Sequence, residues 1–183
     1  MSKKFLDTKT MILCSLFTAL IAIGAFIRIP LPVTVFTFQF TVVLLAGVLL
    51  GAKRGGLATL LYVLIGLIGF PIFTEGGGPQ YILKPTFGYL VAFIITAYLV
   101  GYFREKFGTS SFSKLLLACL LGMVITYSIG SIYTFFILNY ALSTKISYLA
   151  CLASLFPFAF VKDIASCILA VLVGQRLAKH IEF

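Results

Sequence analysis

Long apolar segments alternate with short polar connections along the whole chain. Because a helix needs about 20 mostly apolar residues to cross a bilayer, each long segment is a candidate membrane-spanning helix. The pattern predicts six such helices, at about residues 9–29, 36–52, 56–73, 86–104, 114–139 and 148–178. We therefore expect one all-α integral membrane domain over residues 1–183, built as a bundle of six transmembrane helices.

The composition supports a membrane protein. The chain is 61% hydrophobic and 10% charged, whereas soluble domains are about half apolar and about a quarter charged. A soluble chain of 183 residues could not bury so much apolar surface. The basic N-terminus is like that of a signal peptide, but the apolar run after it is longer and has no small-residue cleavage site. We expect this segment to remain as the first helix.

Lysine and arginine give the predicted helices an orientation. The net charge is +9, and in a membrane protein such an excess sets topology and contacts anionic lipid rather than nucleic acid. One side of the predicted bundle carries 10 basic residues: Lys3, Lys4, Lys9, Lys53, Arg54, Arg104, Lys106, Lys114, Arg176 and Lys179. The other side carries 4: Arg28, Lys84, Lys145 and Lys162. Since the richer side is the cytoplasmic one, both termini of this multi-pass protein of the cell membrane are expected in the cytoplasm.

One acidic residue, Asp163, lies inside a predicted span. A charge at membrane depth costs about 2.5–3.5 kcal/mol on insertion scales, so it normally faces a partner or a wet cavity. Ser166 and Cys167 share its helical face and make that face small and polar. This predicts a pocket wall, and the alternative is an ion pair with Lys162 at the end of the helix.

The connection "FTEGGGPQYILKPTFGYL", residues 73–90, is richer than a plain turn requires. Its glycines allow unusual backbone dihedrals, its prolines stiffen it, and its aromatic rings can cover a flat ligand. Long shaped loops of this kind are usually functional. We expect it to form a lid and part of a pocket, through Gly76, Gly77, Gly78, Tyr81, Lys84 and Tyr89. The alternative is a re-entrant connection with interfacial aromatic residues.

A second stretch on the same side, "RIPLPVTVFTFQF", is held extended by two prolines. The Gln39 side chain can both donate and accept hydrogen bonds. Arg28 could bind a carboxylate, or it could simply extend to the membrane interface from a helix end.

On the first predicted helix, small side chains recur at helical spacing: Ser15, Thr18, Ala19 and Ala22. Such a stripe lets another helix approach closely, either from a partner protein or from the same bundle. The sequence has no phosphate-binding G-x-x-x-x-G-K motif, no H-E-x-x-H and no G-x-S-x-G. We therefore expect no ATPase activity in this chain, no enzymatic role, no metal and no cofactor.

Four blocks together resemble the BioY family: "RIPLPVTVFTFQ", "LLAGVLLGAKRGGLATLLYVLIGLIGFPIF", the glycines with "YILKPTFGYL", and "PF" followed by "KDI". These proteins are the biotin-specific substrate-binding components (S-components) of energy-coupling factor (ECF) transporters. The resemblance implies the six-helix S-component fold and high-affinity capture of biotin at the outer face. It also implies uptake with a transmembrane coupling protein and two cytoplasmic ATPases, which consume the ATP.

Carried over residue by residue, the resemblance implies ligand contacts from Gln39, the Gly76–Tyr81 segment, Tyr89 and Asp163. It implies contacts with the coupling protein from Thr18, Ala19 and Ala22. Asp163 would accept hydrogen bonds from the ureido ring of biotin. Where members of the family carry a lysine one turn after the acid, this chain has Ser166 and places Lys162 before the acid. The biotin carboxylate therefore has three candidate partners, Arg28, Lys84 and Lys162, of which Lys84 lies within the binding-loop block.

Two other functions fit the same features. One is an S-component for a different vitamin, since the fold would be shared. The other is a self-sufficient secondary transporter, although ion coupling requires acidic groups at mid-membrane and Asp163 is the one acid that the prediction puts in a span.

Overall fold

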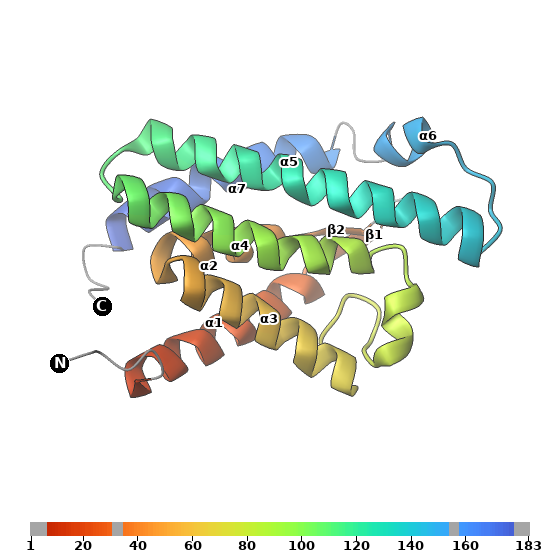
Figure 1. Ribbon diagram of the computed structural model, residues 1–183, viewed down its shortest axis with the longest axis horizontal. Coiled ribbons are helices and arrows are strands. Elements are labelled where there is room, and N and C mark those ends of the chain that lie inside the picture. Colours follow the sequence, from red (N-terminus) through yellow and green to blue (C-terminus); the bar gives the residue numbers. More distant parts are fainter. Residues whose placement is uncertain (1–6, 31–34, 154–157, 178–183) are drawn as a thin grey trace.

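The computed structural model describes residues 7–30, 35–153 and 158–177. The longer helices run along the long axis of the molecule (Figure 1). The elements in chain order are α1 (Thr8–Phe26), β1 (Arg28–Pro30), β2 (Val35–Thr37), α2 (Gln39–Leu50), α3 (Ala52–Ile68), the 3-10 helix η1 (Pro79–Leu83), α4 (Phe87–Phe107), α5 (Phe112–Phe136), the π-helical turn η2 (Ile137–Ala141), α6 (Tyr148–Ala153) and α7 (Phe158–Leu177).

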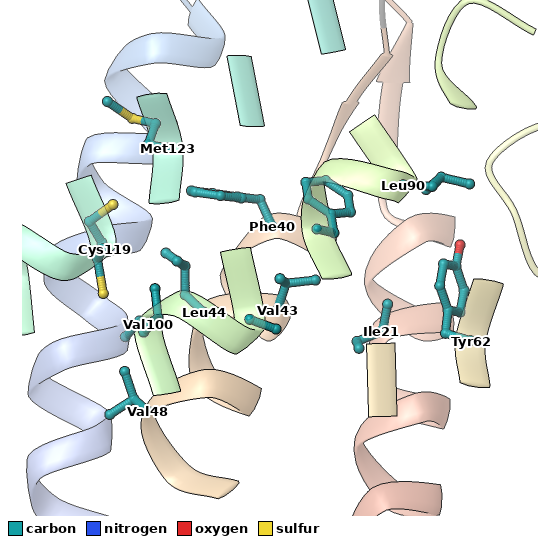
Figure 2. Close-up of a cluster of buried hydrophobic side chains, with 14 of the residues drawn as sticks. Ile21, Phe40, Val43, Leu44, Val48, Tyr62, Leu90, Val100, Cys119 and Met123 are labelled. Atoms are coloured by element: carbon teal, nitrogen blue, oxygen red, sulfur yellow. The ribbon is translucent and has the colours of Figure 1, made fainter. Parts of the chain in front are cut away.

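The centre of the bundle is α2. All of its residues except Val42 and Leu45 are buried, as expected for a helix that is apolar on every side. It packs against α1, α3, α4 and α7. Figure 2 shows Leu44 and Val48 of α2 gathered with Val100 of α4 and Cys119 of α5. This core fixes the positions of the helices around a cavity that begins at the N-terminal end of α2.

A tight turn at Gly51 joins α2 to α3. Gly51 has φ +83°, and the carboxylate of Glu105 lies where a Cβ atom would be. The Glu105 Oε1 atom accepts a hydrogen bond from the backbone N–H of Ala52 at 2.8 Å. Because the first N–H groups of a helix have no partner within that helix, Glu105 of α4 caps α3 and ties the two helices together.

The two ends of the bundle differ in the connections and the basic residues that lie there. The start of α1, the α2–α3 turn, the α4–α5 connection and the end of α7 lie together at one end, on the left in Figure 1. The connection between α3 and α4 and the connection after α5 lie at the opposite end. The first end has the described basic residues Lys9, Lys53, Arg54, Arg104, Lys106, Lys114 and Arg176.

The structure is all-helical as predicted, apart from one short pair of strands. The strands β1 and β2 pair in antiparallel fashion, with Arg28 opposite Thr37 and Pro30 opposite Val35. The apolar residues of β2 form a strand rather than part of a helix, so α2 begins later than the predicted second span. With 12 residues α2 extends about 18 Å, well short of a hydrocarbon core of about 30 Å.

Within the described residues, three helices are long and apolar enough to cross a membrane: Thr8–Phe26, Phe87–Phe107 and Phe112–Ala141. Within the predicted last span, 148–178, the described residues form α6 and α7. The proline that we noted within that span, Pro157, lies outside the described residues.

Candidate functional site

A cavity lies among α2, α4, α5, α7 and the connection of residues 69–86, which we call the α3–α4 loop. The cavity has a volume of about 70 Å³, or about 630 Å³ of atom-free space when its open mouth is included. Aromatic, hydroxyl, amide and charged side chains line it: Thr37, Gln39, Phe40, Thr74, Tyr81, Thr86, Tyr89, Leu90, Phe93, Thr126, Tyr127, Ala159, Lys162 and Asp163. Apolar walls with a few convergent polar groups are typical of small-molecule sites.

Two neighbouring residues of α7 bring opposite charges into this cavity. Asp163 is buried, with 5% of its surface exposed, and its Oδ1 atom forms an ion pair with Lys162 Nζ. Lys162 Nζ also donates to the carbonyl oxygen of Thr37 at 2.7 Å and lies 5.9 Å from the centre of the Phe40 ring. The pocket wall and the ion pair, which were alternatives in the sequence, are therefore present together.

Tyr127 of α5 holds the other oxygen of the same carboxylate. Its hydroxyl donates to Asp163 Oδ2 at 2.7 Å, so both oxygens of Asp163 have a fixed partner. The sequence analysis missed this residue, because a tyrosine in an apolar helix shows no distinctive spacing. Only the packing of α5 against α7 reveals its partner.

Two other polar groups in the cavity have unused hydrogen-bonding capacity. The Gln39 side chain is 2% exposed, and neither its Nε2 atom nor the Tyr89 hydroxyl has a hydrogen-bond partner among the described residues. A buried polar group without a partner costs about 1–3 kcal/mol. A ligand with suitable acceptors would remove that cost. Within the described part of the chain, no cluster of His, Cys, Asp and Glu side chains is placed to hold a metal ion.

Hydrogen bonds fasten the α3–α4 loop to the helices around it. The Gly78 N–H donates to Gly66 O at 2.7 Å, and the hydroxyl of Thr134 on α5 donates to Pro85 O at 2.9 Å. The Tyr81 ring is 2% exposed, and its hydroxyl lies 2.8 Å from the Thr74 hydroxyl. The loop is thus an ordered wall of the cavity in this structure.

The three consecutive glycines shape this loop without lining the cavity. Gly76 and Gly78 have φ of +109° and +99°, values that residues with a side chain rarely adopt. At Gly77 a Cβ atom would collide with the carbonyl oxygen of Phe70. The glycines allow the compact path that places Tyr81 and Thr74 at the cavity.

Two of the three basic residues considered as partners of a ligand carboxylate lie outside the cavity lining. Lys84 Nζ pairs with Glu75 Oε2 at 3.1 Å, and both side chains are partly exposed. Arg28 is exposed in β1. Among the described residues, Lys162 is the basic residue that lines the cavity.

The sequence matches the BioY family over residues 1–183. The chain belongs to the BioY family. It is 38% identical to a probable biotin transporter BioY of Lysinibacillus sphaericus, over 94% of this chain and 88% of that protein. It is 36% identical to the biotin transporter BioY of Thermotoga maritima, over 93% of this chain and 96% of that protein. The resemblance inferred from the four sequence blocks is therefore confirmed.

A solved structure also resembles this member of the BioY family. It is the crystal structure of the S-component for biotin from an ECF-type ABC transporter, with a TM-score of 0.83 and 29% sequence identity. The match covers 98% of this chain and 95% of the other. The likeness therefore extends over the whole fold, including the helices that surround the cavity.

The small residues predicted to contact a partner do not share one open face. The Thr18 hydroxyl donates to Cys14 O at 2.8 Å and to Ala58 O at 2.9 Å, so Thr18 faces α3 inside the bundle. Ala22 is partly buried against the core, whereas Ala19 is exposed. Of the three positions, Ala19 is the one fully available to another protein.

Proposed function

We propose that this chain is the biotin-binding S-component of an ATP-driven ECF transporter in the cell membrane. The observation that carries the proposal is the Asp163 carboxylate, buried in the cavity and held by Tyr127 and Lys162. A fixed acceptor of this kind suits a ligand with paired N–H donors, as in the ureido ring of biotin. Membership of a family whose relatives are named biotin transporters supports the same ligand.

The ion pair suggests how biotin would be oriented. The ureido N–H groups would donate to Asp163, and the ureido oxygen would accept from Lys162 or from the Gln39 Nε2 atom. Phe40 and Phe93, which line the cavity, would cover the apolar ring. The biotin carboxylate lies at the opposite end of the molecule and would be repelled by Asp163. We therefore assign Lys162 to the ring. Lys84 and Arg28, which lie outside the cavity lining, remain the candidates for the carboxylate.

The proposed orientation in the membrane puts both termini in the cytoplasm and the α3–α4 loop outside. The seven described basic residues at the opposite end of the bundle support it, because lysine and arginine concentrate on the cytoplasmic side. We propose six crossings, of which α6 and α7 together would form the last. Biotin would then be captured from outside.

Titration calorimetry without ATP tests this function. We expect the detergent-purified protein to bind biotin tightly and other vitamins weakly. Tight binding of another vitamin would show an S-component of different specificity. Biotin accumulation by this chain alone in proteoliposomes would show a self-sufficient transporter. Transport by an S-component instead requires the coupling protein and the two ATPases.

A further inference from the structure

A second hollow lies on the side of the bundle, between α3 and α4. It has a volume of about 520 Å³. Its lining includes Leu60, Ile95 and Tyr98, the buried Gly56 beneath them, and Lys53, the first of these residues along α3. None of these residues lines the ligand cavity. We call this hollow the α3–α4 groove.

The groove is an apolar surface over a close contact between α3 and α4. Gly56 of α3 is buried, and an added Cβ atom there would lie 3.4 Å from Tyr98 Cβ. Leu60, Ile95 and Tyr98 remain 38%, 43% and 50% exposed. Within the described part of the chain, no element is seated over them. In a membrane these surfaces meet lipid chains or another protein.

The charge at one end of the α3–α4 groove favours a lipid over another protein as its occupant. Lys53 is the second residue of α3, and its side chain is exposed. The acid nearest to this helix start, Glu105, is already engaged with the Ala52 N–H. The end of the groove therefore offers a positive charge beside an apolar channel. A phospholipid with an anionic headgroup has the complementary pattern, a negative head on a slender apolar tail.

We infer that the α3–α4 groove binds an anionic phospholipid, with one acyl chain along Leu60, Ile95 and Tyr98 and the phosphate at Lys53. A transmembrane helix fits less well. With side chains it is about 10–12 Å wide, and close helix packing requires several small residues. The lining of the groove has one small residue, Gly56, among larger side chains. The inference requires only that the chain lies in a membrane, and it is independent of the ligand in the cavity.

Native mass spectrometry can test the site with two lipids of identical chains, phosphatidylglycerol and phosphatidylcholine. We expect Lys53→Gln to lower retention of phosphatidylglycerol about fivefold, the size of effect of one basic side chain near an anionic surface, and to leave phosphatidylcholine unchanged. Leu60→Trp fills the groove and should lower retention of both lipids. The matched controls are Lys106→Gln, at the same end of the bundle, and Leu64→Trp, one turn further along α3.

The thermal unfolding temperature in detergent should stay unchanged in all four variants, which shows that each protein is folded. The inference is wrong if Lys53→Gln and Leu60→Trp retain both lipids as the controls do. It is equally wrong if Leu60→Trp keeps its lipid but no longer co-purifies with the transporter's membrane partner, because the groove would then hold a protein helix.

Discussion

At the residue scale, the feature that sets this site apart is a carboxylate with both oxygens held. Lys162 pairs with one oxygen of Asp163, and the Tyr127 hydroxyl donates to the other. The acid therefore cannot rotate freely, and it meets a ligand in one orientation. Such preorganisation lowers the entropic cost of binding.

Replacing Asp163 should weaken biotin binding. Hydrogen bonds to a charged group contribute about 1.5–3 kcal/mol, so we expect Asp163→Ala to raise the Kd roughly 10- to 150-fold. Asp163→Asn retains one acceptor oxygen and should have a smaller effect. Titration calorimetry gives the affinities, and thermal unfolding in detergent identifies any variant that has lost its fold. An unchanged Kd in a folded Asp163→Ala protein would leave the acid with a structural role only.

Tyr127 should act through Asp163 as a positioning residue. Tyr127→Phe keeps the ring in the cavity but removes the hydrogen bond, so we expect about fivefold weaker biotin binding, the size of about 1 kcal/mol. In an Asp163→Asn background the same change should cost much less, since the two effects share one contact. Tyr102→Phe, on an exposed tyrosine of α4, is the matched control. Additive losses in the double variant would contradict a positioning role.

At the scale of elements, the apolar pattern predicted the long helices closely and the short ones less well. The ends of α1, α4 and α5 differ from the predicted spans by a few residues. The predicted third span continues to residue 73, but α3 ends at Ile68 because Gly69 turns the chain with φ +124°. Asp163, Gln39, Tyr81 and Tyr89 could be selected from the sequence because a polar or aromatic group in such a setting is unusual. Tyr127 could not, because its role depends on which helices pack together.

The path of the α3–α4 loop should depend on its glycines. Since a Cβ atom at Gly77 would collide with Phe70 O, Gly77→Ala should displace the loop and destabilise the protein by about 1–3 kcal/mol, the usual cost of overpacking. Biotin affinity should fall with it, because Tyr81 loses its position. The control is Gly56→Ala, where the added methyl makes an ordinary contact at 3.4 Å. Equal unfolding temperatures for wild type and Gly77→Ala would show that the loop does not need this path.

At the scale of the whole molecule, the bundle has one end with a cavity and one end rich in basic residues. Site-directed labelling can test the proposed orientation, starting from a variant in which the four buried cysteines are replaced. An impermeant maleimide added to intact cells should label Leu83→Cys in the α3–α4 loop, which is 62% exposed in wild type. It should not reach Ser110→Cys, between α4 and α5. Labelling of both positions from outside would overturn the proposed orientation.

Capture and delivery should be separable in this molecule, because the cavity and the exposed face of α1 lie on different elements. We expect Ala19→Leu to retain biotin affinity, since Ala19 is exposed and does not line the cavity. The larger side chain would hold a partner helix away, and close packing is what drives helix association in lipid. ATP-dependent biotin uptake and co-purification with the coupling protein should therefore fall together. Ala165→Leu, on an exposed alanine of α7, controls for added bulk at the lipid surface. Normal uptake by Ala19→Leu in cells that contain the coupling module would exclude this face of α1 as the docking surface.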